Sequence, residues 1–286
     1  MSAETVADSG CEIAEGPLWH PEDERLYWID IPEGALFEYD PVRDDYHHVR
    51  EGAVVGGYTI ESDGTLLFFE DDCAITHWDD GTDRTILDDI PDERGNRFND
   101  VIADPAGRVF AGTMPTDDRL GSLYLVDTDG TYELIIDGID LPNGFGFSNE
   151  EDVFYLTESY GDVIYAYDYD RETGALSRER DLIRFDDEPG MPDGLTVDSN
   201  GGIWSAQFGG GCIIRFSPDG TETDRIELPT PNVTSLIFGG PEYTDLYVTT
   251  AKFDAPEDDP RAGNIFRVDP GYRGVPEHRS TISSSE

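Results

Sequence analysis

The chain has 286 residues with 37% hydrophobic content, which is enough for one large core or two ordinary domains. Its 63 acidic residues outnumber 19 basic ones and give a net charge of −44, so nucleic acid and anionic membrane surfaces are not expected partners, because no basic patch can meet their phosphates. No apolar run approaches a membrane span and the N-terminal residues do not resemble a signal peptide, so we expect a cytoplasmic protein.

The acidic excess favours adaptation to concentrated salt. Self-repulsion at this charge would be severe in dilute buffer and largely screened in molar salt, where the Debye length is about 3 Å. A distributed calcium buffer would instead show clustered carboxylates, whereas these are scattered through turns and solvent-facing strand positions. The three cysteines, at positions 11, 73 and 212, are far apart in the sequence, and none belongs to a CxxC motif. This argues against a disulfide framework and against a thiolate zinc site.

A unit of about 45 residues recurs along the chain. Each copy begins with a short alternating strand, an acidic or polar turn and an aromatic-rich strand, and the copies lie at 16–30, 57–70, 98–113, 142–159, 192–207 and 234–250. A third strand follows in each copy, for example SLYLVDTDG or CIIRFSPDG, and a more polar fourth strand usually comes after it.

The repeat predicts an all-β fold, a six-bladed β-propeller with four antiparallel strands per blade. We expect one propeller domain over residues 1–286, with residues 3–8 completing the last blade and a disordered tail at about 280–286. A seven-bladed ring with one degenerate blade and a pair of β-sandwiches are the alternative architectures.

The first strand of each blade lines the central channel, so its opening residue points toward the channel mouth. Counting back from the first turn of each copy places an oxygen-bearing side chain there in four blades, and gives Gly57 and either Leu236 or Ser235 in the other two. The four are Glu15, Asn99, Asn143 and Asp193.

Two carboxylates with amide oxygens form a hard coordination set that suits one divalent cation, namely Ca²⁺, Mg²⁺ or Mn²⁺. Zn²⁺ is less expected, because the five histidines fall on turns or outer strands and are interpreted as surface residues. Pro-Asn-Gly and Pro-Asp-Gly are also ordinary turn tripeptides, but Glu15 is not a turn former.

Arg97 lies near the expected mouth, where it could balance carboxylates or bind substrate oxygens. Loops 113–121 and 251–263 reach the same face, and Asp117 and Asp118 offer acceptors for sugar-like hydroxyls. Tyr160 and Phe208 could form an apolar wall or simply pack.

The segments EGPLW, RFNDVIADPAGRVFAGTM, LPNGFGFS, MPDGLTVDSNGGIWSAQFGGG and TSLIFGGPEYTDLYVTTA, in this order, resemble the gluconolactonase/regucalcin (senescence marker protein) family over almost the full length. The acidic balance favours a haloarchaeal member. The resemblance implies a propeller that holds one divalent cation and hydrolyses sugar-acid lactones. By the family's pattern Glu15, Asn143 and Asp193 are metal ligands, Asp193 is also the acid/base, and Arg97 and Asn99 hold the substrate, while Asp117 falls where relatives place an acidic substrate contact.

The expected function is therefore the metal-dependent opening of a small sugar lactone of glucono or pentono type to its aldonic acid. The cation could be Ca²⁺, Mg²⁺, Mn²⁺ or Zn²⁺. A non-catalytic calcium-binding regulatory protein and a phosphotriesterase-like hydrolase on the same ring remain open, because a fold does not fix a function. The sequence leaves the choice of lactone and the oligomeric state undecided.

Overall fold

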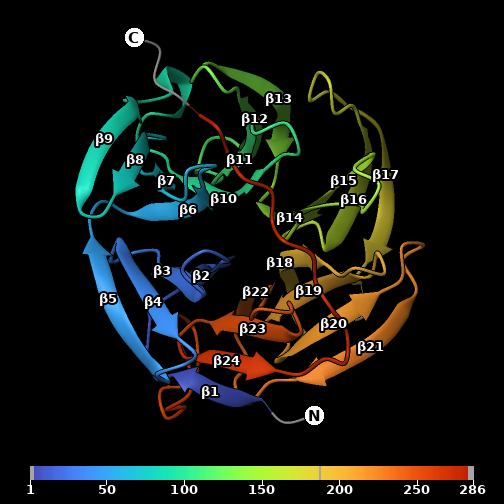
Figure 1. The fold of residues 1–286 in the computed structure, drawn as a ribbon. Helices are drawn as coiled ribbons and strands as arrows, with labels where there is room; N and C mark the ends of the chain where they lie inside the picture. The colour runs from blue at the N-terminus through green and yellow to red at the C-terminus, as the bar shows by residue number, and fades with distance from the viewer. Residues whose placement is uncertain (1–2, 187, 283–286) are drawn as a thin grey trace.

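Six four-stranded antiparallel sheets are arranged around a central axis in the computed structural model (Figure 1), which describes residues 3–186 and 188–282. Within these ranges the only helical segment is the single 3₁₀ turn η1 (Pro91–Glu93). The six-bladed propeller predicted from the repeat is confirmed, and the seven-bladed and sandwich alternatives are wrong.

Five of the sheets are each built from four consecutive strands. They are β2 (Ala14–His20), β3 (Arg25–Asp30), β4 (Ala35–Asp40) and β5 (Asp45–Glu51); β6 (Val55–Ile60), β7 (Leu66–Glu70), β8 (Ile75–Asp79) and β9 (Thr82–Leu87); β10 (Phe98–Ala103), β11 (Val109–Thr113), β12 (Gly121–Val126) and β13 (Tyr132–Ile139); β14 (Pro142–Phe147), β15 (Val153–Glu158), β16 (Val163–Tyr169) and β17 (Leu176–Arg184); β18 (Met191–Val197), β19 (Ile203–Phe208), β20 (Cys212–Phe216) and β21 (Glu222–Glu227).

The sixth sheet closes the ring with strands from both ends of the chain. The strands β22 (Val233–Gly239), β23 (Asp245–Thr250) and β24 (Ile265–Val268) are completed by β1 (Glu4–Ala7), which pairs antiparallel with β24. The predicted pairing of residues 3–8 with the last blade is thus confirmed. This pairing joins the two ends of the polypeptide and leaves no open gap between the first and last blades.

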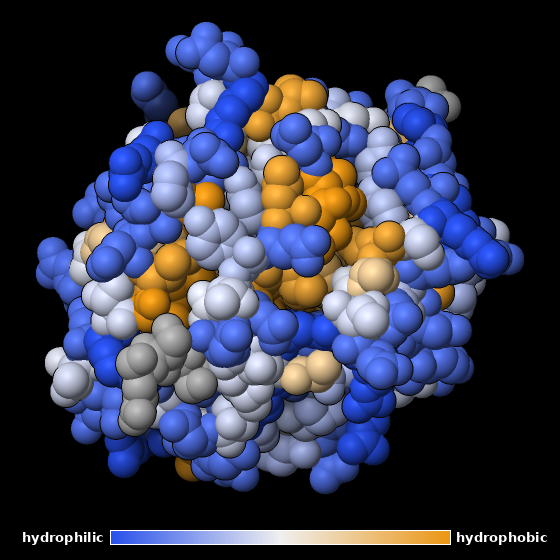
Figure 2. All heavy atoms as spheres, turned by 90° about the horizontal axis from the view of Figure 1, so that it is seen from above, coloured by the Kyte–Doolittle hydropathy of each residue, from blue (hydrophilic) through white to orange (hydrophobic). Residues whose placement is uncertain are grey.

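Burial follows each strand's distance from the axis. Both faces of a blade pack against neighbouring blades, so β7 and β11 are buried at every position, whereas the outermost strands β5 and β9 alternate or are exposed. Large aromatic side chains fill the spaces between blades, such as Trp28 and Tyr247, which share one cluster across the closure. Hydrophilic residues cover most of the surface seen in Figure 2, with separate hydrophobic patches between them.

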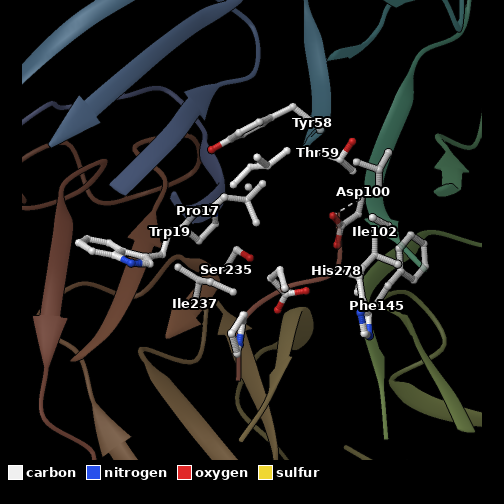
Figure 3. A pocket seen from close by; sticks show the side chains of 18 of the residues that line it. Pro17, Trp19, Tyr58, Thr59, Asp100, Ile102, Phe145, Ser235, Ile237 and His278 are labelled. Carbon is white, nitrogen blue, oxygen red and sulfur yellow. Dashed lines mark hydrogen bonds between the residues drawn. The ribbon is translucent and has the colours of Figure 1, made fainter. Parts of the chain in front are cut away.

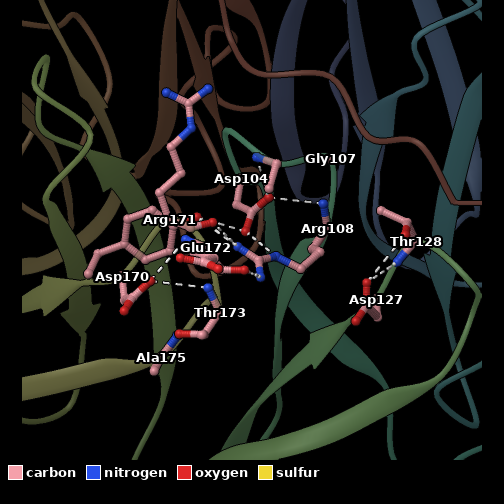
Figure 4. Close-up of polar contacts among 12 residues, drawn as sticks. Asp104, Gly107, Arg108, Asp127, Thr128, Asp170, Arg171, Glu172, Thr173 and Ala175 are labelled. Carbon is pink, nitrogen blue, oxygen red and sulfur yellow. Dashed lines mark hydrogen bonds and ion pairs between the residues drawn. The ribbon is translucent and has the colours of Figure 1, made fainter.

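Two arginines form buried ion pairs with aspartates of the turns that join first and second strands. Arg108 Nε donates to Asp104 Oδ2 at 2.7 Å (Figure 4). Tyr169 Oη of the next blade donates to the same oxygen at 2.8 Å. A matching pair joins Arg215 and Asp198, also at 2.7 Å. These ion pairs connect strands at the end of the ring opposite the expected site.

After β24 the chain crosses that same end of the ring (Figure 1). Gly274 forms a bridge with Asp198, and Ser280 N donates to Ile60 O at 3.0 Å. Ser280 and Ile282 are buried, so residues 280–282 pack against the ring rather than being disordered, because their backbone and side chains find partners at β6. The rest of the expected tail, 283–286, lies outside the described residues. Among the described residues, no helix has the length and apolarity that crossing a membrane requires.

Candidate metal centre and active site at the channel mouth

A β-bulge opens all six innermost strands. In β2, β10, β14 and β18 the antiparallel register with the second strand shifts next to Glu15, Asn99, Asn143 and Asp193. The corresponding shifts in β6 and β22 fall at Gly56 and Thr234. These positions are one or two residues before those expected from the sequence, because counting at a fixed spacing takes no account of the extra residue in a bulge. A bulge re-aims a side chain out of the alternation of the strand, and here it turns the four oxygen-bearing side chains toward one mouth.

Glycines behind the bulges let the blades approach closely. Gly144 has φ +33°, and a Cβ built there would lie 2.3 Å from Asp193 O in the next blade. A Cβ on Gly194 would lie 2.6 Å from the Cα of Ser235. Any larger residue would push the blades apart and spread the candidate site.

Two acidic side chains at the mouth have few hydrogen-bond partners. Asp193 is 6% exposed, and its Oδ1 is buried without a hydrogen-bond partner. Glu15 is half-buried and accepts one bond, from Gly16 N at 2.9 Å. Burial, and then the carboxylate of Asp193, raise the pKa of Glu15 well above its usual value, while burial and Asp100 raise the pKa of Asp193.

The amides and Arg97 form a connected row beside these carboxylates. Asn99 Nδ2 donates to Asn143 Oδ1 at 2.7 Å, and Asn143 Nδ2 donates to Ser159 Oγ at 3.0 Å. Arg97 Nη1 donates to Asn99 Oδ1 at 3.1 Å, and its positive charge partly offsets the rise in the pKa of Glu15. Burial lowers the pKa of Arg97. The structure therefore brings together five of the six predicted site residues.

The donor set fits a divalent cation. The buried carboxylate of Asp193, with one unpartnered oxygen, and the half-buried carboxylate of Glu15 favour a nearby positive charge, which Arg97 supplies in part at Glu15. Carboxylate and amide oxygens are hard ligands, so a hard divalent ion held by Glu15, Asn143 and Asp193 would satisfy the unpaired oxygen and offset the charge.

The sequence interpretation missed Asp100. Its carboxylate points into a cavity of about 90 Å³ that lies along the channel beneath the mouth (Figure 3). Burial raises its pKa to about 6, and it acts on both Glu15 and Asp193. The signal was present in the Asn-Asp pair at 99–100, but strand alternation assigns the second residue to the opposite face, and only the bulge brings both to the channel.

The C-terminal segment closes the far end of this cavity. Glu277 and His278 line it, and burial followed by the charge of Asp100 raises the pKa of Glu277 to about 7. The interpretation of all five histidines as surface residues is thus wrong for His20, which is 3% exposed, and for His278, which is half-buried at the cavity (Figure 3). Tertiary contacts bury both side chains, and the local sequence around them does not predict these contacts.

Loops around the mouth shape a hollow on the same face. Tyr160 and Phe208 line one open hollow together with Ser159, the partner of Asn143. Asp254 of the 251–263 loop lines it too. Tyr160 is 55% exposed, so its ring is available to a ligand as well as to its neighbours.

Asp117 is the predicted site residue that the structure does not bring into contact with the others. It is exposed on the loop between β11 and β12, as is Asp118. The loop itself begins beside the site, because Met114 N donates to Arg97 O at 3.1 Å. Asp117 therefore lies on a segment that is anchored next to Arg97.

Comparison with known proteins adds independent evidence. Residues 13–252 match the family described as SMP-30/Gluconolactonase/LRE-like region. The chain is 46% identical to a pentonolactonase of Haloferax volcanii over 99% of both chains, and 31% identical to regucalcin of Bos taurus over 98% of this chain and 99% of the relative. The crystal structure of a calcium-binding protein, regucalcin from Agrobacterium tumefaciens, superposes with a TM-score of 0.90 at 25% identity, over 97% of each chain.

We expect the cation-free protein to lose stability as the pH rises. The raised pKa values of Glu15, Asp193 and Asp100 mean that the folded state holds protons more tightly than the unfolded state, so the free energy of unfolding falls from about pH 4, the usual carboxyl pKa, through pH 6, where Asp100 titrates. Asp193→Asn removes one buried charge and should flatten this slope and raise stability at pH 7.

Denaturant unfolding in chelator and molar KCl between pH 4 and 8 measures the effect. Asp117→Asn, at an exposed position, is the matched control and should follow the wild type. Equal slopes for wild type and Asp193→Asn would show that the mouth carboxylates are not the source of the pH dependence.

Proposed function

The chain belongs to the SMP-30/gluconolactonase/LRE-like family, and we propose that it opens sugar lactones to aldonic acids with the help of one divalent cation at the channel mouth. Sugar-lactone hydrolysis is supported by the 46% identical relative, which is named a pentonolactonase. The observation that supports the cation is the unpartnered carboxylate oxygen of Asp193, whose charge acts on Glu15 and whose backbone lies against Gly144, the residue after Asn143.

Glu15, Asn143 and Asp193 are the proposed ligands. When bound, the cation would polarise the lactone carbonyl and stabilise the negative charge that develops on its oxygen, an effect worth several kcal/mol. Oxygen ligands are compatible with Ca²⁺, Mg²⁺, Mn²⁺ and Zn²⁺, and they favour the first three, since no histidine or cysteine joins the set.

Asp193 is the proposed general base and acid. Its carboxylate takes a proton from the water that adds to the carbonyl carbon and returns it to the ring oxygen as the carbon–oxygen bond breaks. Such assistance typically contributes about 10²- to 10⁴-fold in rate. The position of Asp193 at the floor of the mouth, with an oxygen free of protein partners, supports this role.

Arg97 and Asn99 are the proposed substrate holders. They lie side by side at the mouth, and their side chains are oriented by bonds to each other and to Asn143. Donors fixed in this way can hold a sugar's hydroxyl oxygens so that its carbonyl faces the ligand set. Asp117, on the anchored loop above, is proposed to accept a hydrogen bond from a hydroxyl at the far end of the sugar.

A calcium-binding role without catalysis is the second candidate, because a structural relative is described as a calcium-binding protein. The same three ligands could bind calcium in such a protein, but the oriented side chains of Arg97 and Asn99 would then have no substrate to bind. A phosphotriesterase-like activity requires a more apolar mouth than Arg97, Asn99 and Glu15 provide.

A lactone panel separates these three functions. With pentono- and hexonolactones we expect acidification that chelator abolishes and that Mn²⁺, Mg²⁺ or Ca²⁺ restores, because each turnover releases an acid; a pH-stat in molar KCl measures it. Cation binding without turnover of any ester would favour the regulatory role, and turnover limited to phosphotriesters would favour the third.

Removing the proposed base tests the assignment of Asp193. Asp193→Ala should reduce lactone turnover at least 10²-fold, because both a cation ligand and the proton acceptor are lost. Initial rates at saturating cation measure this, circular dichroism checks the fold, and Glu150→Ala, at an exposed turn away from the mouth, is the control. Turnover above a tenth of wild type would reject the assignment.

We also propose that the chain works in a cytosol of high salt. The net charge of −44 with a single lysine, Lys252, supports this, since repulsion between exposed carboxylates is screened only at high ionic strength. The melting temperature should therefore rise steeply between 0.1 M and 2 M KCl. A melting temperature that is flat over this range would contradict salt adaptation.

A further inference from the structure

Glu93 is a fully buried carboxylate near the mouth that has no part in the proposed cation site. It ends η1, and three side chains bind it. Tyr124 Oη donates to Oε1 at 3.0 Å, Asn96 Nδ2 donates to Oε2 at 2.9 Å, and the guanidinium of Arg119 pairs with Oε2. A buried carboxylate with a full set of partners is well placed to fix the groups that bind it.

Two of the partners of Glu93 lie on different loops, and the third lies on a strand. Asn96 follows η1 and immediately precedes Arg97, whereas Arg119 lies near the end of the loop between β11 and β12. Both loops therefore meet at one carboxylate. Tyr124 comes from β12 and ties this meeting point to the rigid blade.

Further hydrogen bonds make the two loops one unit. Asn96 Nδ2 also donates to Met114 O at 2.8 Å, and Met114 N donates to Arg97 O at 3.1 Å. Thr116 N donates to Arg119 O at 2.8 Å, which closes the loop on itself. Glu93 thus holds both ends of residues 114–120, the segment that carries Asp117, and the same bonds reach the backbone of Arg97.

We propose that Glu93 is a positioning residue for the lactone. Through Asn96 and Arg119 it fixes the 114–120 loop and Arg97 as one wall of the mouth. The position of this wall determines how much space is available to the hydroxylated chain of the sugar. This inference rests on the proposed lactonase function. It makes Glu93 a determinant of substrate affinity, and of the choice between pentono- and hexonolactones, without a role in cation binding or in the chemical step.

Three variants and one control test this role. Glu93→Gln removes the charge, Arg119→Met removes its ionic partner, and the double variant shows whether the two act through one another. Arg119 is partly exposed, so its replacement is the one that disturbs folding least. The control is Arg108→Met, which breaks the buried ion pair with Asp104 (Figure 4). This pair belongs to the same blade and lies at the opposite end of the ring.

We expect Glu93→Gln and Arg119→Met each to raise KM at least tenfold and to narrow the ratio of kcat/KM between the two lactone sizes. The values of kcat should stay within about threefold, and cation affinity, measured by calorimetry, within about twofold. The double variant should be no worse than Glu93→Gln, because the two changes remove one shared interaction. Hydrogen exchange of amides 114–120 should accelerate in these variants and not in Arg108→Met.

Unchanged KM in both single variants, or a fall in kcat and cation affinity at constant KM, would overturn the role of Glu93. So would an equal rise of KM in Arg108→Met, which would point to a general loss of rigidity. A wild-type protein that hydrolyses no lactone would instead overturn the proposed function, and the substrate role of Glu93 with it. The exchange data, which need no substrate, still report whether Glu93 joins the two loops.

Discussion

The site depends on negative charge that the protein does not neutralise by itself. Burial raises the pKa of Glu15, Asp100 and Asp193. The charges of Asp193 and Asp100 raise the pKa of Glu15 further, and the charge of Arg97 offsets this in part. A protein interior tolerates such an arrangement when the raised pKa keeps the carboxyls neutral or when a bound cation offsets their charge. Cation binding at this point would therefore be coupled to the stability of the folded ring.

The blade repeat explains how side chains from distant parts of the chain reach one point. Every inner strand opens with a bulge at the same end, so a residue placed there faces the axis regardless of its type. Blades with Gly56 or Thr234 at this position add no charge, while the others add a carboxylate or an amide. The backbone thus gives a common position, and the side chain at that position decides the chemistry.

The two ends of the ring have different tasks. At the end opposite the mouth, scarce arginines pair with buried aspartates, as Arg108 does with Asp104, and the C-terminal segment closes the channel with Glu277. At the mouth, Glu93 ties two loops together, and one carboxylate oxygen of Asp193 has no hydrogen-bond partner. Ion pairs hold turns or loops at both ends, and the unpartnered oxygen of Asp193 lies at the mouth.

The sequence by itself determined the propeller and most of the candidate site, because strand alternation, turn residues and the repeat are local signals that each blade displays separately. Glu15, Asn143 and Asp193 were found because their position in the repeat is the same. Only the tertiary structure decided that Asp100 shares the channel and that Glu93 joins two loops, since a bulge and a contact between loops have no local signature. The physical reason is that alternation describes which face of a strand a residue occupies, whereas a bulge changes that face and packing alone chooses the neighbour.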